Sequence, residues 1–370
     1  MAAISALFLT AVFCDTGTPA AAKAPPAAIT AAYPDLTLKI GQAKALLAEA
    51  PIGYSRNGSG NAALAVWDGS PDGEIRLVSI RDGISRTPGF TVERKRYNGV
   101  NSDYRVTEPE GYVVLAGKFD VGRGRSRRTA VYTPYTPGLH TPEMVAAGRA
   151  YLEALLDRAA SELAAAGTAS LADPGKLVTG MVDARTLLAI LVVEHVRYDQ
   201  AEELGLQRVV EEVLVVLAAN GDDAFDHAVS RARAQGLAQF IKSSYLLTRR
   251  RYPAAGLPAD FNAGTTDHLN AAKAQYCLAD WTLAALKKET LADLRLPGFE
   301  EDLGAYIAAG YNGGERRAAG AFYRYPGEWE KPRHGLWRET VTYVRVFRAV
   351  YRQLFPAPDP ATVENRTFDP

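Results

Sequence analysis

The chain has 370 residues, which is long enough for two domains and a large core. Hydrophobic residues make up 47% of it and charged residues 23%, as is ordinary for a globular protein. Lys plus Arg and Asp plus Glu both number 42, so the formal net charge is zero and a nucleic-acid-binding protein is not expected. The two cysteines exclude a Cys-rich zinc site or a disulfide framework, and Cys277, in an apolar helical stretch, is expected to be buried.

Residues 1–24 are predicted to be a signal peptide. The apolar run MAAISALFLTAVFC is too short to span a bilayer but suits the hydrophobic region of an export signal, and Ala22-Lys23-Ala24 offers a small-x-small cleavage site. No basic residue precedes the run, and Phe13 is too large for the usual lipidation signal before Cys14. We therefore expect an exported protein of the periplasm or cell envelope, with only weak support for a lipoprotein.

Residues 25–140 are predicted to comprise a linker and a β-rich region. The Pro- and Ala-rich stretch 17–34 lacks periodicity, which is typical of a linker. The runs EIRLVSI and YVVLAGKF favour strands, and Asn98-Gly99 is a strong hairpin-turn signal. The stretch DVGRGRSRR reads as a solvated loop. The sequence leaves the role of this region open.

Residues 141–356 show helical periodicity. The first helix is expected to begin at Thr141 and Pro142 and to end at Gly167. Further helices are expected near residues 183–198, 204–219, 231–251, 267–288, 300–312 and 335–354, followed by a loose tail at 357–370. The predicted fold class is α+β overall, with a mainly α C-terminal domain and a smaller β-rich N-terminal region.

The helix DARTLLAILVVEHVRY contains the first candidate catalytic residue. Glu194 follows Ile190 by four residues and Leu191 by three, so it lies on their apolar stripe. An ionised carboxylate facing a core is costly, and an apolar setting raises its pKa, as a general acid near neutral pH requires. The alternative interpretation is a Glu at a domain seam, paired with an Arg.

Residues 227–240, HAVSRARAQGLAQF, contain a second pattern: Ser230, then Ala234, and then Gly236, Leu237 and Gln239 in Gly-Leu-x-Gln spacing. Gly236 would let the backbone approach a sugar closely, and Gln239 can hydrogen-bond hydroxyl or acetamide groups. The pattern resembles the SLT-type lytic transglycosylases, bacterial peptidoglycan-cleaving relatives of goose-type lysozyme. Arg233 stands where that family usually has Gly.

Two later segments resemble the same family, in the same order. YIAAGYNGG is similar to its Ala-Tyr-Asn-x-Gly motif, with Gly310 in place of the usual Ala, and would place Tyr311 and Asn312 at the edge of a sugar-binding cleft. WRETVTYVRVF is similar to its Glu-Thr-x-x-Tyr-Val motif, at Glu339, Thr340, Tyr343 and Val344. The resemblance implies that the Tyr343 hydroxyl contacts the catalytic carboxylate.

The resemblance covers roughly residues 183–350. It implies a lysozyme-like fold for the helical domain and peptidoglycan glycan strands as the partner. It also implies cleavage of the bond between N-acetylmuramic acid and N-acetylglucosamine to a 1,6-anhydro product. One glutamate would act as acid and then base, without metal or cofactor. Other cell-envelope proteins are a further class of partner, and no oligomeric state is predicted.

One spacing departs from the family pattern. The family's catalytic Glu usually stands about ten residues before the Ser, whereas Ser230 follows Glu194 by 36 residues (230 − 194). Much of the gap, AEELGLQRVVEEVLVVLAAN, is itself an amphipathic helix, which we interpret as an insertion. Glu211 or Glu212 on this helix is the rival acid. Both share its polar side with Gln207 and Arg208, so Glu194 is preferred.

Two other functions stay open. A hydrolase of the goose-type lysozyme or chitosanase kind would need a second carboxylate to position water, and Asp199, Asp222, Asp223 and Asp226 are available. For the lytic enzyme we expect no carboxylate opposite Glu194. A non-catalytic wall-binding or assembly protein would instead use the β-rich region.

Overall fold

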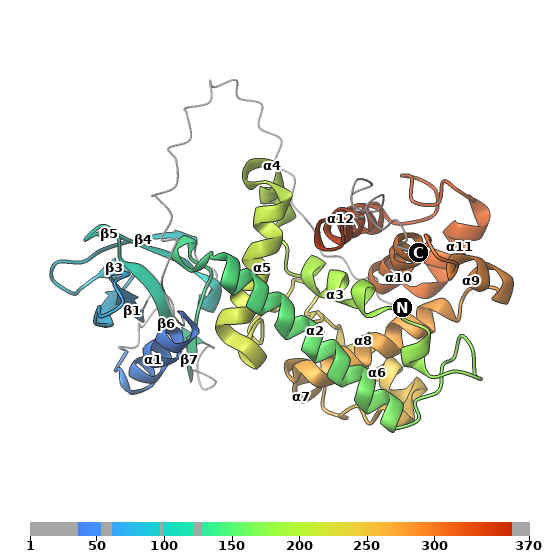
Figure 1. Ribbon diagram of the computed structural model, residues 1–370, viewed down its shortest axis with the longest axis horizontal. Helices are drawn as coiled ribbons and strands as arrows, with labels where there is room; N and C mark the ends of the chain where they lie inside the picture. The colour runs from blue at the N-terminus through green and yellow to red at the C-terminus, as the bar shows by residue number, and fades with distance from the viewer. Residues whose placement is uncertain (1–35, 53–60, 97–98, 122–127, 357–370) are drawn as a thin grey trace, which may run out of the picture. The chain divides into compact units, whose positions relative to one another are not determined.

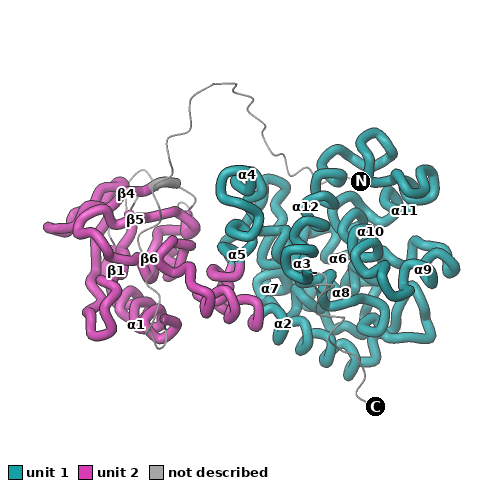
Figure 2. The backbone as a smooth tube through the Cα atoms, turned by 45° about the horizontal axis from the view of Figure 1, so that its top comes forward, with its two compact units in different colours: residues 1–7, 152–213, 225–370 teal, residues 8–151, 214–224 magenta. Residues whose placement is uncertain are grey.

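The computed structural model describes residues 36–52, 61–96, 99–121 and 128–356 (Figure 1). These residues form two compact units (Figure 2). Unit 1 comprises Leu152–Val213 and the residues from Phe225 onward, and unit 2 comprises the residues up to Tyr151 together with Leu214–Ala224. The predicted signal peptide, the Pro- and Ala-rich linker and the tail lie outside the described residues, as does most of the Gly/Arg loop.

The boundary between the units differs from the predicted one at residues 140 and 141. It falls inside two helices, α2 (Pro142–Ala165) and α5 (Leu206–Asn220). The segment Leu214–Ala224, which was predicted to belong to the helical domain, is part of unit 2. The helical periodicity of α5 was detected in the sequence, but periodicity does not show which core a helix face joins.

The described residues of unit 2 form an antiparallel β structure together with α1 and parts of α2 and α5. Its sheet has the strand order β3-β2-β1-β6-β7, and β4 and β5 form a separate pair. The elements are α1 (Leu36–Glu49), β1 (Ala62–Trp67), β2 (Arg76–Arg81), β3 (Ile84–Ser85), β4 (Thr91–Arg96), β5 (Asp103–Glu108), β6 (Val113–Val121) and β7 (Arg128–Tyr132). The strands predicted from EIRLVSI and YVVLAGKF are confirmed as β2 and β6, and β4 and β5 pair as the expected antiparallel strands. Asn98 of the predicted turn lies outside the described residues. Helix α1 was not predicted.

The core of unit 2 explains the position of α5. Strand β1 is buried along its whole length, and α1 packs against β1 and β6 through Ile40, Ala43 and Leu47. Val215 and Ala219 from the C-terminal half of α5 belong to the same apolar cluster. The inserted helix therefore contributes apolar surface to the unit that contains the sheet.

Unit 1 is helical within its described residues. Besides the C-terminal part of α2 and the N-terminal part of α5, it contains α3 (Ala184–Val193), α4 (Ala201–Leu204), α6 (Lys242–Arg251), α7 (Phe261–Thr266), α8 (His268–Leu283), α9 (Lys288–Leu294), α10 (Glu300–Gly313), α11 (Glu315–Arg324) and α12 (Arg338–Leu354). The molecule is therefore α+β. The predicted helix at 231–251 begins only at Lys242, and the residues before it form a loop.

Helix α3 is the central helix of unit 1. It packs against α10 and α12, and every residue from Thr186 to Val193 is buried (Figure 1). The stretch from Leu187 to Val193 is apolar on every side, and such a stretch is stable only when other elements surround it. Asp183 caps its N-terminus by accepting a hydrogen bond from the Arg185 backbone N–H. The helix was expected near residues 183–198, but it ends at Val193.

An ion-pair network fixes α12 beside α10. The Arg348 guanidinium on α12 contacts Glu301 and Asp302 on α10, and also Glu330, at 2.6–2.8 Å. Such multiple pairing around one guanidinium orients it more strongly than a single surface pair would. The network therefore holds in place the helix that contains Tyr343.

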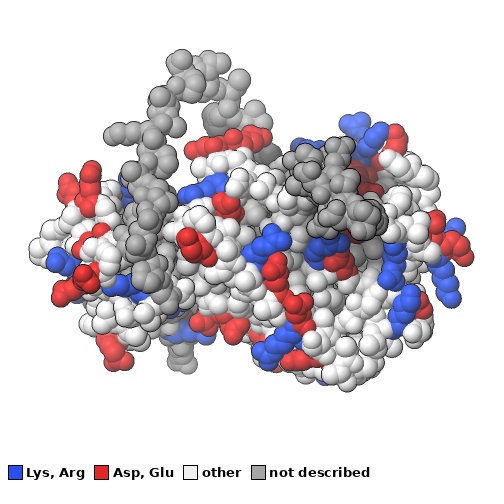
Figure 3. All heavy atoms as spheres, viewed as in Figure 1, with Lys and Arg blue, Asp and Glu red and all other residues white. Residues whose placement is uncertain are grey.

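Two features of composition are reflected in the structure. Cys277 is fully buried in α8, as predicted. On the face shown in Figure 3, positive and negative side chains are interspersed on both units, in line with the zero formal charge.

Among the described residues, no helix is both long and apolar enough to cross a membrane.

Candidate functional site

Glu194 lies at the C-terminal end of α3, where its backbone N–H donates to the Ile190 carbonyl. The residue is half-buried. The Tyr343 hydroxyl on α12 donates a hydrogen bond of 2.5 Å to Glu194 Oε1, although 149 residues separate the two in sequence. The contact expected from the sequence is thus present, because α12 packs along α3.

The surroundings of Glu194 favour its protonated form. Burial raises the pKa of the Glu194 carboxyl to about 7, the hydrogen bond from Tyr343 lowers it, and the negative charge of Glu339 raises it further. Burial and the Glu194 charge also raise the pKa of the Tyr343 hydroxyl well above its usual range, so this hydroxyl stays a donor. A carboxyl with a pKa near 7 can both give and take a proton at neutral pH.

The Tyr343→Phe variant is expected to lower the turnover of a glycan substrate while leaving its binding nearly unchanged. The lost hydrogen bond to a carboxylate is worth on the order of 1.5–3 kcal/mol, which corresponds to a loss of roughly ten- to hundredfold. Steady-state kinetics on soluble glycan fragments separate kcat from KM. An unchanged kcat would show that Tyr343 does not orient the carboxyl.

The loop 228–240 follows the predicted motif but uses several of its side chains internally. The Ser230 Oγ accepts a hydrogen bond from the Ala234 backbone N–H at 3.0 Å. The Gln239 Nε2 donates to the carbonyls of Gly236 at 2.8 Å and Ala228 at 3.2 Å. Ser230 and the amide nitrogen of Gln239 therefore shape the loop. Among the described residues Gln239 Oε1 has no hydrogen-bond partner, so it remains available as an acceptor.

Gly236 lies where the loop backbone packs closely against α7. Its φ is +72°, and a Cβ at this position would lie 1.9 Å from the Thr265 carbonyl oxygen. Glycine is needed because the loop backbone packs directly against α7. The Leu237 side chain is fully buried, so its contribution to the site is its backbone carbonyl.

His195 connects the loop to the end of the helix that bears Glu194. Its Nε2 lies 2.8 Å from the Leu237 carbonyl oxygen, and because a carbonyl only accepts, this nitrogen donates. The imidazole stacks on Phe225 with ring centroids 3.7 Å apart. Burial lowers the pKa of His195 to about 4, so the ring is neutral at physiological pH. His195 thereby fixes the loop relative to Glu194.

Arg233, the residue that departs from the family pattern, adopts a glycine-like backbone conformation with a φ of +62°. A non-glycine residue in this region is strained by about 1–3 kcal/mol. Arg233→Gly is therefore expected to raise the free energy of unfolding by about 1 kcal/mol, after the greater entropy loss of glycine is subtracted.

Arg231→Gly is the matched control for this prediction. Arg231 is also exposed on the same loop, but its φ is not positive. This control should lower stability, because here glycine brings only its entropic cost. Denaturant unfolding of both variants measures the effect. Equal destabilisation by the two would contradict the strain assigned to Arg233.

Tyr311 and Asn312 lie at the end of α10, close to the same site. The Tyr311 hydroxyl donates to the Ala238 carbonyl of the loop, and its ring packs on Phe240. Burial and the charge of Glu194 raise the pKa of the Tyr311 hydroxyl well above its usual range. The Asn312 Oδ1 accepts from the Thr340 hydroxyl at 2.8 Å. Among the described residues its Nδ2 has no partner, so it can donate to a ligand.

The rival acids on α5 have other roles. Glu212 is buried and pairs with Arg197 at 2.5 Å and with Arg208 at 3.5 Å. Glu211 accepts a hydrogen bond from Gln207 at 2.8 Å. Glu212 therefore joins α5 to the segment that follows Glu194, and these contacts of the two glutamates involve none of the predicted site residues.

Four other carboxylates were considered for a hydrolase. Asp222 and Asp223 belong to unit 2, Asp199 is exposed in the turn after α3, and Asp226 lies 3.9 Å from His268 Nε2. Instead, Glu339 on α12 is the carboxylate whose charge acts on Glu194. Our expectation concerned a carboxylate opposite Glu194, and it stays a prediction.

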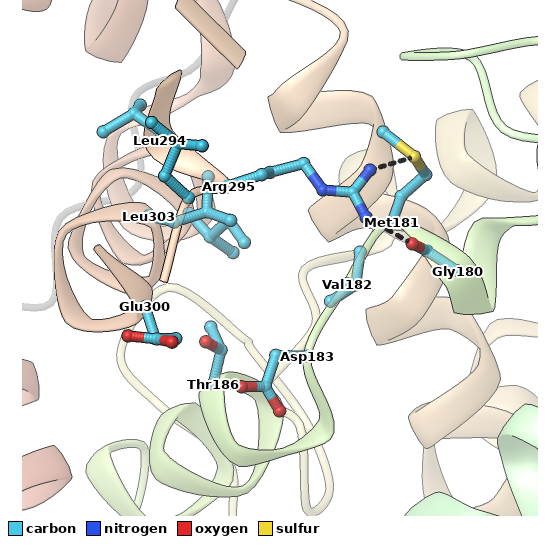
Figure 4. Close-up of a pocket in the computed structure, with 11 residues that line it drawn as sticks. Gly180, Met181, Val182, Asp183, Thr186, Leu294, Arg295, Glu300 and Leu303 are labelled. Atoms are coloured by element: carbon cyan, nitrogen blue, oxygen red, sulfur yellow. Dashed lines mark hydrogen bonds between the residues drawn. The ribbon is translucent and has the colours of Figure 1, made fainter. Parts of the chain in front are cut away.

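A cavity of about 230 Å³ lies at the opposite end of α3 (Figure 4). Arg295 borders it and donates to the Gly180 carbonyl at 2.8 Å. Its lining is Gly180, Met181, Val182, Asp183, Thr186, Leu294, Arg295, Leu296, Glu300, Leu303 and Ile307. Both carboxylates of the lining have partners: Asp183 caps α3 and pairs with Arg185, and Glu300 accepts a hydrogen bond from the Gly298 backbone N–H at 3.0 Å.

Within the described part of the chain, no group of three or more His, Cys, Asp or Glu side chains is arranged to hold a metal ion. Comparisons with models of protein families, with curated proteins and with solved structures found no match. The inference of function therefore depends on the residues of the site and on the motifs in the sequence.

Sequence reasoning overlooked His195 and the influence of Glu339. The backbone carbonyls of the loop at Gly236, Leu237 and Ala238 accept hydrogen bonds from the side chains of Gln239, His195 and Tyr311, respectively. A carbonyl is present at every position, so residue type does not reveal these contacts. The one available signal for His195 was its place directly after Glu194.

Proposed function

We propose that unit 1 is a peptidoglycan lytic transglycosylase with a lysozyme-like fold and that Glu194 is its general acid and then its base. The observation that carries the proposal is the hydrogen bond between Tyr343 and Glu194 at 2.5 Å. The two residues are 149 positions apart in the sequence, and the resemblance to the family implied that they are in contact. The proposal includes an exported protein of the periplasm or cell envelope whose partner is the glycan strand.

In this mechanism the protonated Glu194 donates to the oxygen that links N-acetylmuramic acid to N-acetylglucosamine. The bond between that oxygen and muramyl C1 breaks, and the acetamido group stabilises the cationic centre. The carboxylate of Glu194 then removes the proton of the muramyl C6 hydroxyl, whose oxygen bonds to C1. Since the nucleophile belongs to the substrate, proximity replaces a bound water. The pKa of about 7 suits both proton transfers.

A hydrolase on the same site is the second candidate, and Glu339 is the observation that favours it. A second carboxylate near the acid could orient a water molecule, as in ordinary glycosidases. Incubating the purified protein with peptidoglycan and weighing the fragments decides between the two. Anhydro ends, lighter by one water, support the lytic enzyme. Reducing ends support the hydrolase, and intact glycan refutes both.

A further inference from the structure

Arg317 is a cation that stacks on an aromatic ring close in sequence to residues of the candidate site. Its guanidinium carbon lies 3.9 Å from the centroid of the Trp337 ring. Arg317 is exposed and Trp337 is half-buried. Among the described residues, no carboxylate lies within ion-pair distance of Arg317, whereas the adjacent Arg316 pairs with Glu315 at 3.7 Å. Arg317 therefore retains its hydrogen-bond donors.

The stacked pair lies next to residues of the candidate site in both segments that form it. Arg317 follows Asn312 by five residues, and Trp337 precedes Thr340 by three. The hydrogen bond from Thr340 to Asn312 joins these two segments. Trp337 also lies six residues before Tyr343, a distance of about 9 Å along the axis of α12. The pair is thus within a few residues of the groups that surround Glu194.

The geometry suits a planar anion. An indole ring holds a guanidinium through a cation–π interaction and leaves the N–H groups at its edge free. This edge matches the two oxygens of a carboxylate, and a guanidinium already fixed on a ring loses less freedom when it binds one. The negative charge of Glu339, which acts on Glu194, would disfavour an anionic group of the substrate nearby, and a fixed positive charge would offset this repulsion.

We propose that Arg317, supported by Trp337, binds a carboxylate carried by the glycan substrate. This inference depends on the proposed function of unit 1 and narrows its substrate class to acidic glycans, as opposed to neutral chitin-type chains. The carboxylate can belong to the lactyl group of muramic acid or to a peptide attached to it. Both sources present the same chemistry to the guanidinium.

Calorimetric titration tests the inference in the Glu194→Gln background, so that no ligand is cleaved. The ligands are peptide-free muramyl glycan, peptide-bearing muramyl glycan and neutral N-acetylglucosamine oligomers of equal length. Arg317→Gln is expected to raise Kd for an acidic glycan roughly tenfold and to leave the neutral oligomer unaffected. Whichever acidic ligand shows the loss identifies the source of the carboxylate.

Three comparisons accompany the titration. Arg316→Gln removes the charge of the neighbouring residue, whose side chain is 87% exposed. This variant should leave every Kd unchanged. Trp337→Phe keeps a smaller aromatic ring and should weaken acidic-glycan binding less than Arg317→Gln does. Added salt should weaken binding of acidic glycan by the parent protein more than by Arg317→Gln.

The outcomes separate the inference from the proposed function. If Arg317→Gln changes no Kd, or changes the Kd values of neutral and acidic ligands by the same factor, Arg317 does not bind the carboxylate. The proposed binding of glycan by the protein is unaffected by that result. If the parent protein binds none of the three glycans, the proposed function itself fails. Thermal unfolding of each variant confirms that the exposed substitutions leave the fold intact.

Discussion

The Glu194→Gln variant is expected to fold normally and to lose nearly all cleavage of peptidoglycan. Gln has the same shape and can still accept the hydrogen bond from Tyr343, but it cannot transfer a proton. Loss of a required general acid typically costs about 100-fold or more in rate. Release of soluble fragments from purified peptidoglycan measures the effect.

Glu211→Gln provides the control for this experiment, because it removes a carboxylate from the rival helix α5. It should retain the parent rate. If Glu194→Gln instead keeps more than about a tenth of the rate, Glu194 is not the acid, and Glu211 and Glu212 must be reconsidered.

The parent protein should also lose kcat/KM as the pH rises above about 7, since the first step of the proposed mechanism needs a protonated Glu194.

Helix periodicity placed Glu194 on an apolar stripe, whereas its pairing with Tyr343 was implied by the resemblance to a known family. Glu194 follows an apolar helix, and a buried carboxylate requires a partner that can hydrogen-bond it. The resemblance to a known motif supplied that partner. Both side chains act through their own functional groups, which residue type reveals, so this part of the site could be found in the sequence.

The loop before α6 shows where this reasoning stops. Residues 231–241 have helix-forming Ala, Leu and Gln, which led to the wrong prediction of a helix. Arg233, Gly236 and Gln239 all adopt positive φ, which a helix does not permit, and only the glycine signals this in the sequence. Packing against Thr265 and the bond from His195 impose the conformation. These are tertiary contacts that no local pattern encodes.

The assignment of α5 failed for a related reason. Its amphipathic pattern correctly predicts a helix with one buried face. Any apolar neighbour can bury the apolar face of this helix, however. Val215 and Ala219 pack in the core that contains residues of the sheet. Only the three-dimensional arrangement distinguishes an insertion within one unit from a helix shared by two.

The same Glu194→Gln variant is expected to be more stable than the parent protein above pH 7. The pKa of Glu194 is about 7 in the folded state, compared with its ordinary value of 4.5. Between these two values the folded protein holds a proton that the unfolded chain has released. The parent's free energy of unfolding therefore falls as the pH rises from about 4.5 to 7 and levels off above that range.

The size of the effect follows from the same shift. At pH 8 the charged, desolvated carboxylate should destabilise the parent on the order of 3 kcal/mol relative to Gln, whereas near pH 4.5 the two proteins should be similar. Denaturant unfolding across this pH range measures the difference. Glu202→Gln, which removes the same charge from the exposed surface of α4, should change stability by less than about 0.5 kcal/mol at any pH.

A stability difference that does not grow between pH 5 and pH 8 would contradict the burial assigned to Glu194. If the difference grows as expected, the carboxyl that the mechanism requires is a source of instability in the folded protein. The protein then retains this residue in spite of its energetic cost, as expected when a buried acid serves a reaction and not the fold. Combined with the loss of cleavage in the same variant, this would assign the elevated pKa to function.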